Sequence, residues 1–465
     1  MIRTKPMKLR ATIAFLVLLV TVVSYMSIKL VYVAWEQERV RGQELGRKTS
    51  TNYILVSNGL PILKSSHISN ETSTNPQFRS HPGFGEFVSV NCKAIFEGDM
   101  QAIEQANNKI HLRDNLYSDQ AIHLQTQNCE EFRRYHGYNS VPTTKEETNF
   151  PIAYSIVFHK DIAQVNMLLK AIYRPQNLYC LHLDAYSGNA IRSAAESLAA
   201  CFSNVFLASR LEYVTYKGFS RLRADINCME DLLSKTQKWK YMINLPGQEY
   251  PLKTNLELVK ILKIYNGSND IEGITGKRML PIRYQYKHKY VSSKSGKSLL
   301  IRTGQLKEKP PYNITIVKGS AYGVFSKEFV RFVVKTKISK EFLQWCKDIS
   351  SPDEYFWATL HHNTHLGTPG GYSGPPDEKP WLATYASWRG RDQCAGKWVH
   401  GMCVFGVGDL PLLITKKELF ANKFYLDYQP VALHCMDEWI HNKTTASLPF
   451  DSMYYRALPF VKKPQ

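Results

Sequence analysis

Two adjacent carboxylates in Ser351–Leu360, read as SPDEYFWATL, have a setting that suits acid–base chemistry. The Ser351-Pro352 pair predicts the start of a helix, because serine is a favoured cap and proline is tolerated in the first turn. Asp353 and Glu354 would then face the positive end of the helix dipole. A simple helix start accounts for the whole pattern. Alternatively, one carboxylate is held rigidly at the helix mouth as a general base.

Two other stretches carry side chains that could bind ligands. His361, His362 and His365 include a pair spaced four apart, but no glutamate lies between them as in H-E-x-x-H. We therefore predict a polar loop there and no zinc site. Lys277–Lys297 is rich in lysine, arginine and tyrosine and contains no acid. It is either a solvated loop or a rim where cations hold phosphate and tyrosines stack on sugars.

Apolar runs of strand length alternate with helical patterns through the first half of the chain, which predicts an α/β domain with a mostly parallel sheet. Ligands of such sheets bind at the carboxyl ends of the strands, so His159, Asp184 and the segment after Leu245 become candidate pocket residues. The expected strands are Ile152–Phe158, Leu178–Asp184, Val205–Ala208, Tyr241–Leu245 and Ile314–Val317, and the expected helices are 162–172 (capped by Asp161), Ala190–Cys201 and Arg223–Ser234.

The N-terminal region predicts a membrane anchor. Basic residues in 1–10 precede a long apolar run over 11–35, and acids follow it, so residues 1–10 should be cytosolic and the rest lumenal. The alternative is a cleaved signal peptide, but the run is long for one and no small-x-small cleavage site follows. Residues 36–88 are polar and are interpreted as a lumenal stem, which leaves 89–465 as the folded domain.

Composition and cysteine usage fit a lumenal globular domain. The chain has 465 residues, a net charge of +19 and nine cysteines without a CxxC pair. The charge favours an anionic ligand or surface, whereas no zinc-finger or recognition-helix pattern supports nucleic-acid binding. An oxidising lumen favours disulfides with one thiol left over. Four N-x-[ST] sequons agree with this compartment, at Asn70, Asn266, Asn313 and Asn442.

Local strings spread over 88–438 resemble one enzyme family, the core 2/I-branching β-1,6-N-acetylglucosaminyltransferases, which are type II Golgi membrane proteins. The resemblance is dense and keeps the same order along the chain. It is carried by IAYSIV at Ile152, CFSNVF-x-ASRLE at Cys201, SR-x-x-AD-x-NC at Ser220, WKY-x-INL at Trp239, PLKTNLE at Pro251, GSAY at Gly319, SPDEY-x-WAT at Ser351 and FANKF at Phe420.

The resemblance implies a GT-A-like fold without the usual metal-binding D-x-D, and an inverting transfer of GlcNAc from UDP-GlcNAc to a 6-hydroxyl of an O-glycan. No metal cofactor is expected. Cys346 has no counterpart in the family and would remain a free thiol. The implied disulfides are Cys92–Cys435, Cys129–Cys201, Cys180–Cys228 and Cys394–Cys403.

On the donor side, the resemblance places the catalytic base at Glu354 and a phosphate-binding lysine at Lys423. His400 stands where the family has a second phosphate-binding arginine. Histidine is charged only near or below about pH 6.5, so this is the most consequential departure, and Lys397 could compensate for it. Asp184 corresponds to a residue beside the uridine, and His159 lies near the same strand ends.

On the acceptor side, the resemblance places sugar contacts at Glu272 and Arg283. The family's Trp and Tyr acceptor platform becomes Tyr385 and Ser387 here, with Trp388 adjacent. Two alternatives therefore stand beside a core 2-like transferase. One is a family member that has lost catalysis and binds glycans or protein partners in the Golgi. The other is an enzyme that uses a different donor sugar, such as xylose.

Overall fold

The computed structural model describes residues 90–108, 117–138, 140, 142–292, 298–446 and 450–461, all within a compact unit that spans 78–465. The predicted tail (1–10), anchor (11–35), stem (36–88) and the sequon at Asn70 lie outside these ranges. No helix among the described residues combines the length and the apolar character that a membrane crossing needs.

A six-stranded mixed sheet organises the domain, with the strand order β3-β2-β1-β4-β9-β6. Only β9 runs antiparallel to its neighbours, so the predicted α/β class with a mostly parallel sheet is confirmed. The strands are β1 (Ile152–Phe158), β2 (Leu178–Leu183), β3 (Val205–Leu207), β4 (Tyr241–Pro246), β6 (Asp270–Ile271) and β9 (Gly323–Ser326).

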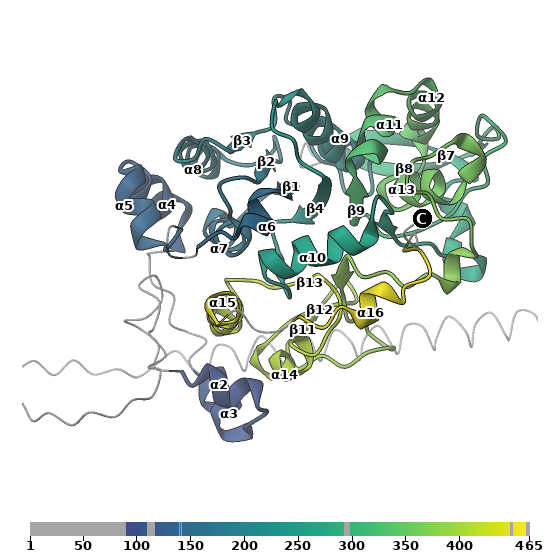
Figure 1. Cartoon of the computed structure of the whole chain (residues 1–465). Helices are drawn as coiled ribbons and strands as arrows, with labels where there is room; N and C mark the ends of the chain where they lie inside the picture. Colours follow the sequence, from purple (N-terminus) through teal and green to yellow (C-terminus); the bar gives the residue numbers. More distant parts are fainter. Residues whose placement is uncertain are drawn as a thin grey trace, which may run out of the picture. The chain divides into compact units, whose positions relative to one another are not determined.

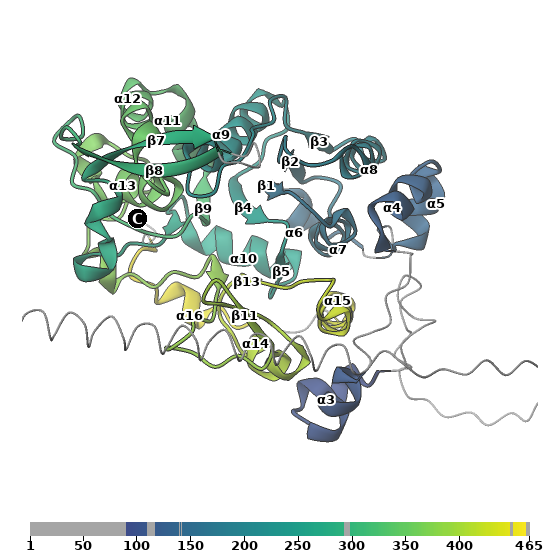
Figure 2. The same cartoon turned by 180° about the vertical axis from the view of Figure 1, so that it is seen from behind.

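Helices cover both faces of this sheet, because alternate strand residues point into two separate cores. Figures 1 and 2 show α9 and α11 on one face and α7 and α10 on the other. The helices around the sheet are α6 (Lys145–Thr148), α7 (Ile162–Ile172), α8 (Asn189–Ala200), α9 (Phe219–Ser234), α10 (Asn255–Tyr265), α11 (Lys327–Lys335), α12 (Lys337–Trp345) and α13 (Asp353–His362).

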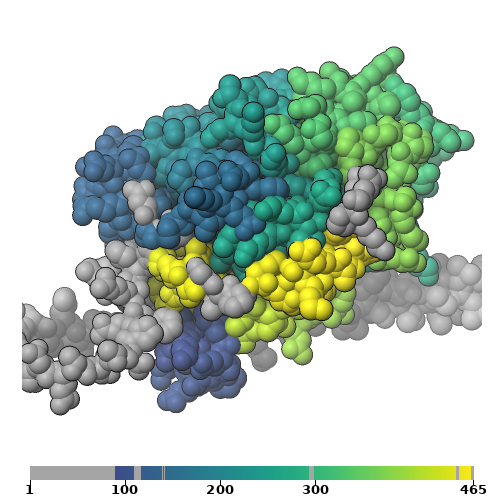
Figure 3. All heavy atoms as spheres, viewed as in Figure 1, coloured from purple at the N-terminus to yellow at the C-terminus, as the bar shows by residue number. Residues whose placement is uncertain are grey.

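Smaller elements complete the domain. A second sheet has the order β10-β13-β5, and two antiparallel hairpins, β7–β8 and β11–β12, project from the loops. Figure 3 shows the C-terminal residues packed along α10. The bounds are α2 (Cys92–Phe96), α3 (Met100–Asn107), α4 (Asp119–Gln125), α5 (Cys129–Tyr135), β5 (Glu249–Pro251), β7 (Tyr286–Ser292), β8 (Ser298–Leu306), β10 (Thr384–Tyr385), β11 (Lys397–Val399), β12 (Met402–Val404), α14 (Leu410–Leu413), β13 (Phe420–Asn422), α15 (Pro430–Thr445) and α16 (Met453–Arg456).

Four local predictions were wrong. Asp161 and Ser351 do not cap helices through their side chains, because both adopt left-handed backbone conformations, with φ of 57° and 53°. Ile314–Val317 forms no strand, although Ile314 and Val317 are buried. His361 and His362 lie in the last turn of α13, not in a polar loop.

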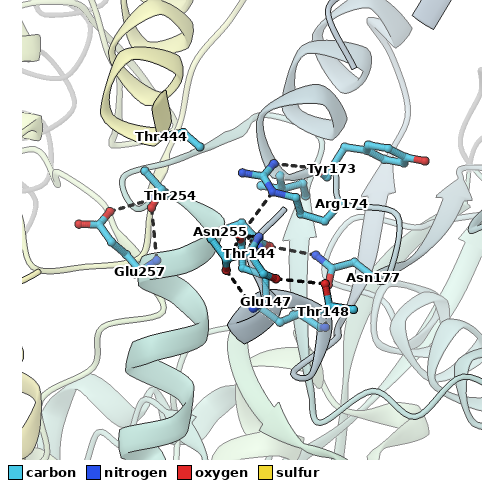
Figure 4. Close-up of polar contacts among 12 residues, drawn as sticks. Thr144, Glu147, Thr148, Tyr173, Arg174, Asn177, Thr254, Asn255, Glu257 and Thr444 are labelled. Carbon is cyan, nitrogen blue, oxygen red and sulfur yellow. Dashed lines mark hydrogen bonds and ion pairs between the residues drawn. The ribbon is translucent and has the colours of Figure 1, made fainter. Parts of the chain in front are cut away.

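A buried polar network fixes the amino ends of the first two strands (Figure 4). The Glu147 carboxylate of α6 pairs with Arg174 at 3.1 Å and accepts a hydrogen bond from Asn255 at 2.8 Å. Asn177 donates to Asn255 and accepts from the Ile152 backbone. The network therefore joins α6, α10, β1 and β2 at the amino ends of the parallel strands, opposite to their carboxyl ends.

The four disulfides are those that the family resemblance implied, and Cys346 is a buried free thiol. The sequon residues Asn266 and Asn313 are exposed, whereas Asn442 is half-buried within α15. Glycosylation at these positions stays a prediction.

Candidate active site

Glu354 stands at the mouth of α13, and two cations hold its side chain. Arg283 Nη1 lies 2.8 Å and Lys318 Nζ 2.9 Å from the same oxygen, Oε2. Within the described residues, Oε1 has neither a hydrogen bond nor an ion pair. The Glu354 backbone is fixed as well, because its carbonyl accepts a hydrogen bond from Gly319 at 2.6 Å. The carboxylate is therefore oriented while one oxygen stays available.

The neighbouring acid, Asp353, has a different environment. It is buried, and this burial raises its pKa to about 6, although the Arg221 charge opposes the rise. Arg221 also forms an ion pair with Asp225 of the same helix, α9, at 2.7 Å. Since Asp353 points into the protein and Glu354 remains partly exposed, Glu354 is the carboxylate of this pair that a substrate can reach.

Glu272 lies beside this cluster, directly after β6. Burial raises its pKa, and the nearby Lys318 charge acts in the opposite direction. A side chain at Gly319 would collide with the Glu272 carbonyl, since an added Cβ would lie 2.2 Å from that oxygen. This close backbone approach brings Glu272, Lys318 and Glu354 together, with Arg283 completing the group.

A second cluster consists of three lysines around one tyrosine ring. The ammonium groups of Lys160, Lys423 and Lys397 lie 4.5, 5.1 and 5.7 Å from the centroid of Tyr425. Lys397 also lies 4.0 Å from the ring of Tyr428. Lys160 is paired with carboxylates at 3.0 and 3.5 Å, but Lys397 and Lys423 have no acidic partner in the described part of the chain. Gathered cations of this kind favour an anionic ligand.

His400 sits at the tip of the β11–β12 hairpin, which the Cys394–Cys403 disulfide closes. It is exposed and adopts a left-handed conformation with φ of 53°. Its ring centroid lies 6.4 Å from that of Tyr216, an exposed residue in the loop before α9. The hairpin thus carries His400 at its tip and also Lys397, a member of the lysine cluster.

Both clusters lie along the carboxyl edge of the parallel strands. Asp184 follows β2, and its backbone N–H donates to the Phe158 carbonyl of β1 at 2.9 Å. Its carboxylate accepts from the backbones of Tyr186 and Val214, so it holds two loops of the candidate donor pocket. His159 follows β1, and its backbone carbonyl accepts a hydrogen bond from the Ser187 hydroxyl.

The predicted aromatic platform is dispersed. Tyr385 stacks on Phe405, and Lys416 lies 4.3 Å from its ring centroid. Trp388 is 42% exposed and bridges to Met402 of the hairpin that carries His400. No described contact joins either residue to Glu354.

Sequence reasoning missed Lys160, Tyr425 and Lys318. Lys160 follows His159 at the end of β1, and Tyr425 follows FANKF directly, so both stood beside residues already selected. Lys318 precedes GSAY, where nothing in the local pattern indicates its contact with Glu354.

The carboxyl edge of the sheet carries an oriented carboxylate and a cluster of cations. Such a site can deprotonate one substrate and stabilise negative charge on another. Residues 152–413 match the family model of the Core-2/I-Branching enzyme. The chain belongs to this enzyme family.

Curated relatives share this family over most of their length. The human β-1,3-galactosyl-O-glycosyl-glycoprotein β-1,6-N-acetylglucosaminyltransferase is 36% identical over 77% of this chain and 86% of its own. The human enzyme of the same name with the number 3 is 36% identical over 76% of this chain and 83% of its own. Zebrafish (Danio rerio) enzyme 4 is 38% identical over 76% and 84%.

Proposed function

We propose that this protein is a β-1,6-N-acetylglucosaminyltransferase that transfers GlcNAc from UDP-GlcNAc to a 6-hydroxyl of an O-glycan, with inversion and core 2-like branching. The names of its relatives support this activity. The observation that carries the proposal is the Glu354 carboxylate, which Arg283 and Lys318 hold by one oxygen and leave available at the other.

Glu354 acts as the general base. Its available oxygen takes the proton of the acceptor hydroxyl while the hydroxyl oxygen attacks the anomeric carbon from the face opposite UDP. UDP departs with the bonding electrons, and a single displacement inverts the anomeric centre. One carboxylate suffices, because UDP is a good leaving group that needs no general acid, unlike the sugar leaving group of a glycosidase.

The lysine cluster around Tyr425 stabilises the departing diphosphate. Lys423, Lys397 and Lys160 supply positive charge where most GT-A enzymes bind a divalent cation. Their charges also oppose metal binding at this place, which supports a GT-A-like enzyme that works without a metal cofactor. Asp184 and His159 line the donor side, and Glu272, Arg283, Tyr385 and Trp388 contribute to the acceptor side.

The chain organisation follows from the same proposal. Residues 1–10 form a cytosolic tail, 11–35 a signal-anchor in the Golgi membrane, 36–88 a stem and 89–465 the lumenal transferase domain. The anchor composition supports this topology.

A second candidate is a family member that has lost catalysis and binds glycans or partners in the Golgi. His400 favours it, because an exposed histidine replaces an arginine that would be charged at every lumenal pH. The dispersed platform of Tyr385 and Trp388 favours it as well.

Transfer from UDP-GlcNAc to a Galβ1-3GalNAc acceptor by the purified full-length protein tests both candidates. We expect activity that survives EDTA and falls about 10²–10⁴-fold in Glu354→Gln. His400→Arg is the matched variant, since it places a permanently charged side chain at the tip of the hairpin.

Transfer by His400→Arg but not by the wild type would mean that the scaffold is intact and the phosphate contact is lost. Full activity of Glu354→Gln would refute the assigned base. If neither the wild type nor His400→Arg transfers GlcNAc to this acceptor or to other O-glycans, the binding-protein candidate is favoured.

A further inference from the structure

A cavity of about 710 Å³ is lined by the start of α9, by the loops that follow β2 and β3, by the β7–β8 hairpin, and by α12 with the turn after it. Lys340 of α12 and Lys347 of that turn both line the cavity. Neither Glu354 nor any member of the lysine cluster lines this cavity.

The described lining carries an excess of positive charge. Lys340 and Lys347 are exposed, and their ammonium groups have no acidic partner among the described residues. Arg223 adds a third cation, although it also pairs with Glu230 at 3.2 Å. The acid in the lining, Glu212, already accepts a hydrogen bond from an asparagine at 2.8 Å. The two free lysines remain available to an anion.

Three tyrosines also line the cavity. Tyr186 and Tyr213 are 45% and 63% exposed and meet edge to face, with ring centroids 4.9 Å apart. Tyr290 is held in place, because its hydroxyl accepts the Phe219 backbone N–H at 2.8 Å. Exposed tyrosine rings are rigid and amphipathic, so they can stack on the apolar face of a sugar while their hydroxyls stay hydrated.

We propose that this cavity binds an anionic saccharide, a sugar with a carboxylate or a sulfate ester, that the acceptor glycoprotein carries. The tyrosines take the ring, and Lys340 and Lys347 take the anionic group. This inference rests on the proposed function for its source of glycans. One backbone contact links the cavity lining to the segment that carries Glu354: Phe219 is two residues from Lys217, whose carbonyl accepts the Ser351 backbone N–H at 2.7 Å.

Direct binding to the full-length protein, without donor, tests the proposal. The probes are 3′-sialyllactose, lactose 3′-sulfate and neutral lactose, titrated by calorimetry. We expect at least one anionic probe to bind about tenfold more tightly than lactose, which two exposed charge contacts can supply. The probe that does so identifies the carboxylate or the sulfate as the anion.

The double variant Lys340→Ser/Lys347→Ser should abolish that preference, whereas Tyr213→Ala should weaken all three probes. Lys238→Ser/Lys335→Ser is the matched control, since it removes the same charge from exposed lysines outside the cavity. Equal affinity for all probes, or a preference that survives the Lys340/Lys347 variant, would overturn the proposal.

Failure of the proposed function is read separately. Both double variants should keep wild-type transfer to the neutral Galβ1-3GalNAc acceptor and the wild-type melting temperature. If the protein transfers no sugar at all, the binding preference for anionic probes still reports on the cavity alone.

Discussion

At the residue scale, the lysine cluster around Tyr425 is built from three separate segments. Lys160 follows β1, Lys397 belongs to the β11–β12 hairpin and Lys423 follows β13, yet all three surround Tyr425. His400, where the family resemblance predicts an arginine, contacts Tyr216. Under the proposed function, the lysines carry the phosphate-binding role that the resemblance assigns to that arginine.

This arrangement predicts that Lys397→Ala raises the KM for UDP-GlcNAc and lowers kcat, together about tenfold or more in kcat/KM, because a charge contact to the leaving group is lost. Inhibition by free UDP should weaken in parallel. Lys235→Ala is a suitable control, since Lys235 also lies over an aromatic ring, 4.2 Å from the centroid of Phe206, but outside the lysine cluster. An unchanged response to UDP would remove Lys397 from the donor site.

At the element scale, β5 is an edge strand of the small sheet β10-β13-β5. It pairs with β13, which precedes Lys423, and β13 in turn pairs with β10, which contains Tyr385. Glu249 in β5 accepts a hydrogen bond from Asn422 at 3.1 Å, while its second oxygen is buried without a described partner. Burial raises the pKa of Glu249 to about 8.

The raised pKa predicts a pH-dependent stability. The folded protein keeps the Glu249 proton that the unfolded chain releases above about pH 4.5, so this group's contribution to stability falls as pH rises toward 8. Glu249→Gln should therefore have a free energy of unfolding roughly 1–3 kcal/mol higher than the wild type at about pH 7.5, and should melt at a higher temperature there. At about pH 5 the melting temperatures of the two proteins should be similar. Glu328→Gln, an exposed acid on α11, should match the wild type at both. Equal melting of Glu249→Gln and wild type at the higher pH would contradict the assigned protonation.

At the scale of the whole molecule, disulfides of very different span hold the domain together. Cys92–Cys435 joins α2 to α15 across 343 residues, whereas Cys394–Cys403 closes a span of nine. Replacing both members of the long pair by serine should lower the free energy of unfolding by about 3 kcal/mol more than the same change in the short pair. The reason is that the unfolded chain gains more conformational entropy when a longer loop is released.

The short pair should show the opposite balance. It closes the hairpin that carries Lys397 and His400, so Cys394→Ser/Cys403→Ser should lose transfer activity while its melting temperature changes little. Denaturation and transfer measured on both double variants check this prediction, and equal losses of stability would contradict it.

Much of the fold could be predicted from local sequence. The bounds of β1 agree with its apolar run, and α7, α8 and β2–β4 agree to within about two residues, because continuous apolar runs between turn residues suit buried parallel strands. The caps failed where tertiary contacts control the backbone. Ser351 is left-handed and its N–H binds Lys217, a contact that no local pattern encodes. The apolar run Ile314–Val317 packs into the core without a ladder partner.

The sequence by itself determined the α/β order, the sheet edge that carries the candidate site, and Glu354 as the candidate base, since these depend on local periodicity and on recognisable strings. Only the tertiary structure decided which cations reach that base and which gather around Tyr425. Lys318 and Arg283 meet Glu354, and Lys160 meets Tyr425, across long stretches of chain. Charges act through space, so residues remote in sequence become partners only when the sheet brings their loops to one edge.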